Sequence, residues 1–140
     1  MSGIEYRAIR PQDYEAVRQF LAGLGWERRV RDPLRFAKMM VRADRTVLAL
    51  DGTRVVGCAR ALCDGVSNGY ISMLAVAEDR RGQGIGREIV RRLTAADEGD
   101  IEGSITWVLR AGRGSREFWE KLGFAASEIA MERTRREQDI

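Results

Sequence analysis

The segment that most constrains the fold is an apolar run ending at Val76, followed by charged residues and a glycine-rich turn that leads into a helical pattern. The first turn of a helix carries backbone N–H groups without partners and the positive end of the helix dipole. Glycines allow a bulky anion to come close to those N–H groups. We therefore predict that the strand, the turn with Gly82, Gly84 and Gly86, and the following helix form a phosphate site.

Three known phosphate-binding patterns compete for this turn. A dinucleotide fingerprint requires G-x-G-x-x-G; Gly82 and Gly84 fit it, but Arg87 stands at the third glycine position. A P-loop requires G-x-x-x-x-G-K-[ST], and the chain contains no such run. The third pattern, [Q/R]-x-x-G-x-[G/A], is matched by residues 81–86 at every position.

In this place after a strand pattern, residues 81–86 resemble motif A of the GNAT superfamily of N-acetyltransferases. A second segment, residues 118–124 (F-W-E-K-L-G-F), resembles the family's F-Y-x-K-L-G-F. Each segment alone is equally compatible with an ordinary helix cap or helix end, but the two occur in the family's order and spacing. The resemblance covers most of the chain, with its specific motifs between residues 70 and 124.

Hydrophobic periodicity gives the element order β-α-α-β-β-β-α-β-α-β. This order predicts an α+β fold with a mixed central sheet and helices on both faces, and it is also the order that the GNAT (acyl-CoA N-acyltransferase) fold implies. Strands are expected at residues 6–9, 46–50, 55–63, 70–76, 105–109 and 124–132, and helices from Pro11, from Pro33, from Ile85 and after a Ser115 cap.

Local signals mark the ends of several elements. Asp32-Pro33 reads as a helix N-cap followed by proline in the first turn. Asp51-Gly52 is a hairpin signal. Residues 26–32 read as a charged loop. The apolar stripe of the second helix is expected at Leu34, Ala37, Met40 and Val41, and that of the helix after the glycine turn at Ile85, Ile89, Leu93 and Ala96.

The composition fits one domain: of 140 residues, 44% are hydrophobic, which is enough for a core. We assign residues 1–133 to a single domain and residues 134–140 to a polar tail. No window is apolar enough to span a membrane, and the first residues lack signal-peptide character. A cytoplasmic protein without a membrane partner is expected, in which Cys58 and Cys63 are buried or half-buried free thiols.

The chain contains no histidine. The supply of residues therefore argues against a Cys/His zinc site, and no metal is expected. Schemes of the Ser-His-Asp and Cys-His kinds are excluded for the same reason. A general base must be a carboxylate, a tyrosine, a thiolate, a terminus or water.

The net charge is +3, and nearly all of the basic residues are arginines. The arginines gather around the glycine turn, near Arg110 and in the tail. Nucleic-acid binding requires a coherent basic face with base-reading or stacking groups, and the sequence has no such motif, so no nucleic-acid partner is expected. A polyanionic cofactor accounts for the first two clusters, and helix-surface pairs such as Glu88 with Arg92 account for others. A homodimer is left open.

The resemblance implies acetyl-CoA as the cosubstrate, with its pyrophosphate on the main chain of the glycine turn. In the family, the strand before the turn parts from the next strand and leaves main-chain groups free. This implies the Leu74 N–H as the oxyanion donor and Val76 as the partner of the pantetheine arm. The cofactor-binding residues implied are Leu74, Ala75, Val76, Arg81, Gly82, Gln83, Gly84, Ile85, Gly86 and Arg87.

The chain departs from the family at the acid and base positions. Trp119 stands where many members have a tyrosine that protonates the leaving thiolate. Tryptophan cannot usefully transfer a proton, so Trp119 is expected to pack against the cofactor or the core. Some relatives carry a glutamate where this chain has Tyr70. Candidates for the base, directly or through water, are Asp64, Tyr70 and Ser72, although Asp64 before a glycine is also a turn signal.

In the family, the loop between the first two helices lines the acceptor slot. Here that loop contains Trp26 and Asp32, an aromatic beside mixed charges, which suits a small polar amine; an ordinary exposed loop is the alternative. The leading hypothesis is an N-acetyltransferase that moves an acetyl group from acetyl-CoA to a primary amine, of a small molecule or a protein, by direct transfer in a ternary complex. An acyl-CoA binding or sensing module with little catalysis is the alternative, and a nucleotide-binding fold is disfavoured by Arg87.

Overall fold

The computed structural model describes residues 3–112 and 114–133, and the chain divides into two compact units, residues 1–110 and 111–140. The first unit contains a five-stranded sheet in the order β1-β2-β3-β4-β5. The first four strands pair antiparallel, and β5 pairs with β4 in parallel, so the sheet is mixed as predicted. The strands are β1 (Ile4–Arg7), β2 (Arg45–Asp51), β3 (Arg54–Cys63), β4 (Asn68–Val76) and β5 (Thr106–Leu109).

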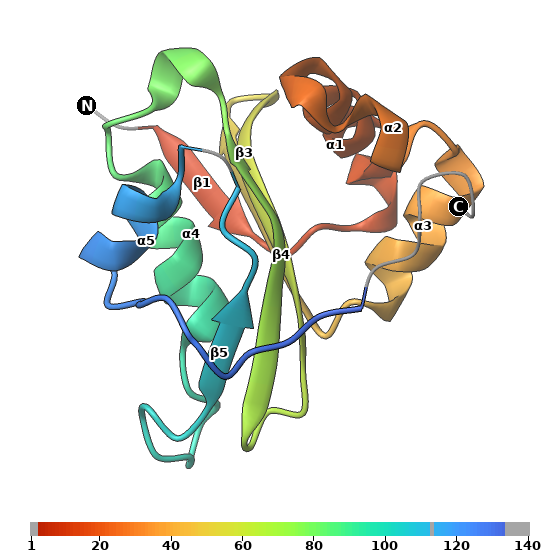
Figure 1. The fold of residues 1–140 in the computed structure, drawn as a ribbon. Coiled ribbons are helices and arrows are strands. Elements are labelled where there is room, and N and C mark those ends of the chain that lie inside the picture. Colours follow the sequence, from red (N-terminus) through yellow and green to blue (C-terminus); the bar gives the residue numbers. More distant parts are fainter. Residues whose placement is uncertain (1–2, 113, 134–140) are drawn as a thin grey trace. The chain divides into compact units, whose positions relative to one another are not determined.

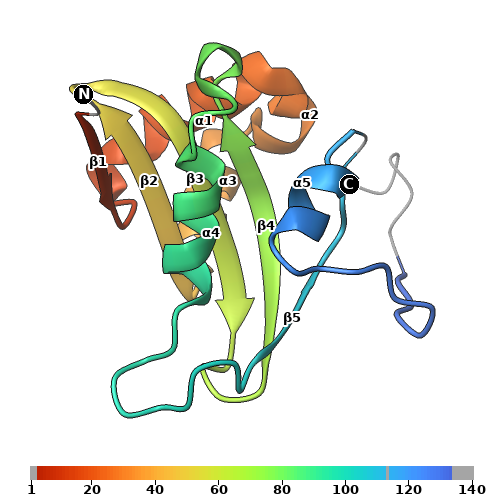
Figure 2. The same ribbon diagram turned by 90° about the vertical axis from the view of Figure 1, so that its left-hand side faces the viewer.

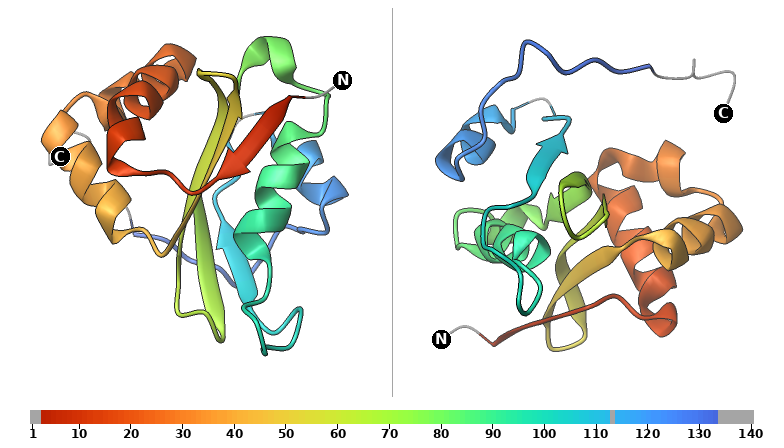
Figure 3. Two further views of the ribbon diagram at one scale, coloured as in Figure 1. Left: turned by 180° about the vertical axis from the view of Figure 1, so that it is seen from behind. Right: turned by 90° about the horizontal axis from the view of Figure 1, so that it is seen from below.

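Helices cover both faces of this sheet, which confirms the prediction (Figure 1). On one face, here named the α1–α3 face, lie α1 (Tyr14–Leu21), α2 (Glu27–Val30) and α3 (Pro33–Arg42). On the other, the α4 face, lies α4 (Ile85–Thr94) (Figure 3). None of the helices in the described ranges has both the length and the apolar character that a membrane crossing requires.

The α4 face is closed by a short apolar stripe. Ile85, Ile89 and Leu93 are at most 3% exposed, and the helix ends at Thr94, so Ala96 lies beyond it. Gly57 of β3 lies under this stripe: a Cβ there would lie 2.8 Å from Ile89 Cδ1. The absence of a side chain at this position therefore lets α4 pack closely against the sheet.

The core of the α1–α3 face is built from the sheet-facing sides of the helices and from residues of β2, β3 and β4. Its buried cluster consists of Val17, Leu21, Val30, Phe36, Met40, Leu48, Leu50, Cys58, Met73 and Ala75. Cys58 is buried and Cys63 is half-buried, and both are free thiols, as predicted.

Two predictions about the α1–α3 face were wrong. The charged loop at 26–32 contains a helical turn, α2, that buries Val30 in the core. In α3, Met40 is buried as predicted, but its buried partner is Phe36, one turn away, whereas Leu34 is 83% and Val41 69% exposed. Leu34 and Val41 are seven positions apart and share the solvent side of the helix. The Asp32 cap is confirmed, because its carboxylate accepts from the N–H groups of residues 34 and 35.

The second unit contains α5 (Arg116–Lys121) and irregular backbone. The strand predicted at 124–132 is absent from the structure. The Ser127 hydroxyl accepts bonds from the N–H groups of Ile129 and Ala130, which gives this segment a local alternative to a strand. Ser115 precedes α5, but its hydroxyl donates to the Gly112 carbonyl instead of capping the helix. The tail predicted at 134–140 lies outside the described residues.

Candidate functional site

A β-bulge interrupts β4 just before the glycine turn. Ser72 pairs with Arg60 and Ala75 pairs with Cys58, so Met73 and Leu74 together stand opposite the single residue Ala59. Met73 has φ 61°, and it is the one non-glycine residue with positive φ among those described. A long side chain in this conformation is strained, and such strain is concentrated at functional sites. A bulge also re-aims the backbone, because its extra residue is left out of the ladder.

Beyond this bulge, β4 runs without its parallel neighbour. The β4–β5 pairing covers residues 68–71 and 106–109, whereas β4 continues to Val76. Figure 1 shows β5 ending well before β4 does. Residues 72–76 of β4, including Leu74, therefore have no strand paired to them on the β5 side within the described chain. This is the parting of strands that the resemblance implied.

The glycine turn follows directly. A short turn of 3-10 helix, Glu78–Arg80, leads to Gly82 and Gly84, which have φ 78° and 87°. A Cβ at either glycine would meet nothing within 4 Å, so the space beside the turn is open and positive φ alone requires glycine here. Gly84 is the N-cap of α4 and offers no side chain to its N–H groups.

An uncapped helix start beside open space fits a phosphate group, because the N–H groups of the first turn are then free to donate to it. Arg81 and Arg87 are exposed at this turn. Figure 2 shows α4 lying along the sheet with the turn at one end of the helix. The buried apolar stripe of α4 therefore fixes the position of the N–H groups.

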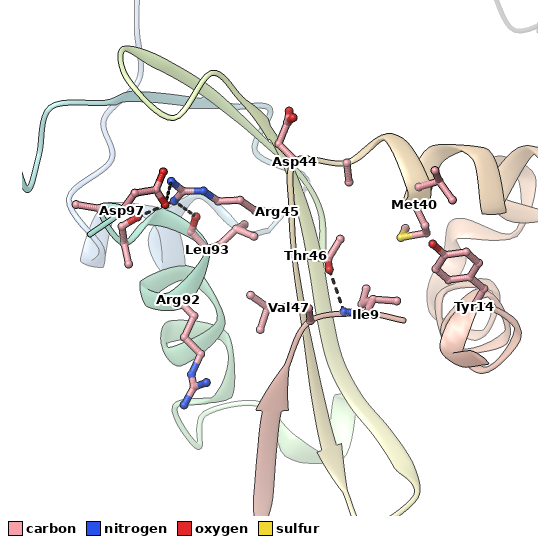
Figure 4. A pocket seen from close by; sticks show the side chains of 15 residues that line it. Ile9, Tyr14, Met40, Asp44, Arg45, Thr46, Val47, Arg92, Leu93 and Asp97 are labelled. Atoms are coloured by element: carbon pink, nitrogen blue, oxygen red, sulfur yellow. Dashed lines mark hydrogen bonds and ion pairs between the residues drawn. The ribbon is translucent and has the colours of Figure 1, made fainter. Parts of the chain in front are cut away.

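Two clefts flank α4 at opposite ends. The larger, of about 630 Å³, lies at the C-terminal end of α4, and its lining comes from both sides of β2 (Figure 4). In it, Arg45 donates to the Leu93 and Ala95 carbonyls and pairs with Asp97. The smaller, of about 370 Å³, includes Gln83 and Ile85 beside the glycine turn. A helix of this length spans about 15 Å, so the larger cleft is remote from the turn.

The structure brings together two of the three base candidates. Tyr70 and Ser72 lie two positions apart on β4, immediately before the bulge, and both are half-buried. The Ser72 hydroxyl accepts a bond of 3.2 Å from Arg60 Nη1. This leaves the hydroxyl proton of Ser72 free for a further partner.

Asp64 is engaged elsewhere. One carboxylate oxygen accepts from the N–H groups of Val66, Ser67 and Asn68 at 2.8–3.1 Å, and the other accepts from the Ser67 hydroxyl. These bonds hold the pKa of Asp64 far below its ordinary value. Such a carboxylate is a poor base, and the arrangement supports the turn role. Burial raises the pKa of the Cys58 thiol to about 12, which also argues against a thiolate there.

The residues expected at the acceptor loop are also partly engaged. Trp26 is the last residue of a wide helical turn, Ala22–Trp26, and packs against the core cluster. The Arg29 guanidinium lies over its ring, 5.6 Å from the ring centre. Asp32 caps α3. These contacts account for both residues without an acceptor, so their role in binding the acceptor stays a prediction.

Trp119 is described within the second unit. Its ring packs edge-on against Phe118 at 5.1 Å and Phe124 at 5.2 Å between centroids. This aromatic cluster accounts for a large apolar side chain at position 119 without a proton-transfer role.

Two residues beside the candidate site were not expected from the sequence. Arg60 is half-buried on β3, and its Nε is buried without a hydrogen-bond partner in the described part of the chain. The signal was present, since Arg60 is the single charged residue in the run 55–63. Met73 carried no such signal, because the sequence does not reveal which apolar residue of a strand takes positive φ.

Comparison with known proteins decides the family. A model of the acetyltransferase (GNAT) domain matches residues 42–126, more than half of the chain. The chain belongs to the GNAT acetyltransferase family. The region matched contains the bulge, the glycine turn and α5. The family's activity and its use of acetyl-CoA therefore apply to this enzyme.

Solved structures agree on the fold. An acetyltransferase from Trypanosoma brucei is 25% identical, with 94% of this chain and 99% of that chain covered and a TM-score of 0.69. A protein from Clostridium acetobutylicum, described as a predicted acetyltransferase and solved with acetyl-CoA, is 15% identical over 94% and 96%, with a TM-score of 0.72. A ribosomal-protein-alanine N-acetyltransferase from Brucella melitensis is 20% identical over 96% and 99%, with a TM-score of 0.74. No curated protein matches the chain.

Proposed function

We propose that this GNAT enzyme transfers the acetyl group of acetyl-CoA directly to a primary amine within a ternary complex. The observation that carries this proposal is the continuity of three features in residues 72–87: a strained bulge, a strand end without its parallel neighbour, and an uncapped helix N-terminus. One short segment thus offers main-chain donors both to a thioester carbonyl and to a pyrophosphate.

Each part of the segment has a role in this mechanism. The N–H groups of residues 82–87 hold the pyrophosphate, with Arg81 and Arg87 adding charge. The backbone of Val76 pairs with the pantetheine arm. The Leu74 N–H donates to the carbonyl oxygen as negative charge develops on it, and in enzymes such stabilisation is usually the largest single contribution to the rate. Acetyl-CoA supplies a thioester whose leaving thiol, with a pKa of about 8.5, needs little help from an acid.

The amine must lose its proton before or during attack. Tyr70 and Ser72 lie beside the bulge and are the groups of this chain that we assign to move that proton, through water where direct contact is not made. Asp64 is not included, because its oxygens are committed to the turn after β3. Trp119 supports packing in its own unit and has no role in the transfer.

The test separates an enzyme from a binding module. Thiol release from acetyl-CoA is measured across a panel of amines, together with the affinity for CoA by calorimetry. Steady turnover with at least one amine is expected. Tight CoA binding without turnover on any amine would refute the transfer reaction and favour the sensing module.

The binding turn is tested by Gly84→Glu. We expect CoA binding to be lost, because the new side chain fills the open space and repels phosphate. Gly99→Glu is the matched control: Gly99 also has open space around it and φ 89°, so the backbone strain is the same. Unchanged CoA affinity in folded Gly84→Glu would place the pyrophosphate elsewhere.

A further inference from the structure

Four polar residues cross the lower part of the α1–α3 face, and we name them the polar strip: Thr46, Arg60, Tyr70 and Ser72. Thr46 pairs with Arg60, and Arg60 pairs with Ser72, so these side chains share one face. Cys58, two positions before Arg60, is in the core under the helices. The strip therefore continues the α1–α3 face beyond its apolar core.

Arg60 is the only charge in this strip, and it is not neutralised. Among the residues described, its side chain donates one hydrogen bond, to the Ser72 hydroxyl, and no carboxylate lies at ion-pair distance. Its Nε is buried and has no partner in this part of the chain. Four other arginines that emerge from the strands or the turns beside them each pair with an aspartate: Arg7 with Asp13, Arg45 with Asp97, Arg54 with Asp79 and Arg80 with Asp51.

Such an arrangement is costly for the free protein. Burial disfavours the charged form and lowers the pKa of Arg60, while its electrostatic interaction with Tyr70 opposes this. An arginine nevertheless stays charged at neutral pH. A half-buried cation without a counterion costs free energy that a bound anion would recover.

The location of this charge is close to the reacting centre. Ser72, which holds Arg60, directly precedes the bulge residues Met73 and Leu74. Strand residues advance by about 3.3 Å each, so Ser72 and Leu74 are separated by about 7 Å. An anion on Arg60 would thus lie within the length of one small molecule from the proposed oxyanion donor.

We propose that Arg60, with the hydroxyls of Ser72 and Tyr70, binds the carboxylate of an acceptor that carries both a primary amine and a carboxylate, as a small amino acid does. This inference rests on the proposed transfer reaction. One cation and two neutral donors match a single negative charge better than a dianionic phosphate. Asp32 and Asp64 accept hydrogen bonds in a helix cap and a turn, so neither is available to favour a purely cationic amine.

The experiment compares acceptors that differ only in the anion. Glycine and β-alanine are assayed against their amides and methyl esters, with rates expressed per concentration of unprotonated amine, because the substituent changes the amine pKa. For the wild type, kcat/KM is expected to be about 10-fold or more higher for the carboxylates. Arg60→Gln should lower kcat/KM for the carboxylates by about 10–100-fold, chiefly through KM, and leave the amides unchanged.

Matched variants separate binding from structure. Arg60→Lys should keep part of the preference, because it retains the charge. Arg35→Gln removes an exposed arginine of α3 that has no ion pair with any of the residues described, and it should leave all rates unchanged. If Arg60→Gln does not fold, Ser72→Ala and Tyr70→Phe provide the second measurement. Their role in proton transfer predicts a lower kcat for every acceptor, and their role as anion donors predicts in addition a higher KM for the carboxylates alone. A lower kcat without that rise in KM would overturn the anion site.

The outcomes distinguish the two proposals. Turnover of amines without preference for the carboxylates, or an equal loss on all acceptors in Arg60→Gln, would overturn the role of Arg60 and leave the transfer reaction standing. No turnover with any amine, with CoA binding intact, would overturn both.

Discussion

The two faces of the sheet are built from the same strands but differ in how completely apolar side chains cover them. Along β3, Gly57 lies directly under α4, and Ala59 and Ala61, which follow it at every second position, are apolar and buried. Along the other side of β3, Cys58 is buried under the helices, but the next residue on that side is the unneutralised Arg60. One face is a completed core, and the other changes from core to polar strip within two residues.

We interpret this difference as a division of roles: the α4 face supports the glycine turn, and the α1–α3 face contains the proposed acceptor site. The α4 face has one task, to hold the helix N-terminus and its N–H groups in place, and close packing is sufficient for it. The α1–α3 face leaves the polar strip beside the bulge, where the proposed acceptor would meet hydrogen-bond donors and a charge. The lower stability expected of such a face is the ordinary cost of a binding site.

The largest effect that would test this comparison is on folding. Ile89 of α4 is fully buried, so Ile89→Ala should reduce the free energy of unfolding by about 2–5 kcal/mol. Arg60→Gln should change it by about 1 kcal/mol or less, because Arg60 has few favourable contacts to lose. Chemical denaturation measures both. Equal losses would mean that the strip is as much a part of the core as the α4 face.

The second effect concerns the lower end of the α4 face. A Cβ at Gly69 would lie 2.3 Å from a ring carbon of Trp107, its partner on β5. Gly69→Val should therefore cost about 1–3 kcal/mol by overpacking. Gly23→Ala, where a Cβ meets nothing within 4 Å, should be neutral or stabilising by up to about 1 kcal/mol. A neutral Gly69→Val, seen by denaturation, would show that this end of the face is loosely packed.

The third effect isolates strain on the site side. Met73→Ala and Met73→Gly both remove the buried side chain, but glycine tolerates φ 61° and alanine does not. We expect the glycine variant to be about 1 kcal/mol more stable than the alanine variant. On the regular part of β3, Ala61→Gly should instead lose stability. If alanine is the better residue at position 73, the bulge is unstrained and its positive φ carries no functional weight.

Much of the fold could be predicted from the sequence, because hydrophobic period and turn residues are local. β2, β3 and β4 match their predicted ranges to within a few residues, and the Asp32 cap and the Asp51-Gly52 hairpin are present. The errors arose where tertiary contacts decide. α3 buries Phe36 in place of Leu34. Residues 124–132 form no strand, and two of their N–H groups donate to the Ser127 hydroxyl instead.

For the candidate site, only the backbone geometry of the glycine turn could be predicted from the sequence. Glycine spacing reports the turn, since positive φ at Gly82 and Gly84 requires that residue. The bulge depends on how β4 registers against β3, which no local pattern encodes. Arg60 was visible as a charge in an apolar run, but the lack of a counterion among the described residues follows only from the three-dimensional positions of their carboxylates. Asp64 shows the reverse case, a candidate base whose hydrogen bonds commit it to a turn.

The smallest expected effect tests whether the difference between the two faces extends to the solvent-exposed surfaces of the helices that cover them. On the outer surfaces, Glu15 of α1 bonds to Arg18 and Gln19, and Glu88 of α4 bonds to Arg91 and Arg92. In each case these bonds lower the carboxyl pKa from its ordinary 4.5 to about 2. A lowered folded-state pKa stabilises the protein above pH 4.5, and this contribution is lost as the pH falls toward 2. Because the pairs are exposed, the contribution is small and is screened by salt.

Glu15→Gln and Glu88→Gln should therefore lose similarly little stability at pH 7, and both should show a weaker fall in melting temperature than the wild type between pH 4.5 and pH 2. High salt should reduce the difference from the wild type in both. Thermal unfolding across this pH range, at low and high salt, measures the effect. A much larger loss in one variant would mean that the helices differ on their solvent sides too, and the contrast between support and site would then extend beyond the two faces of the sheet.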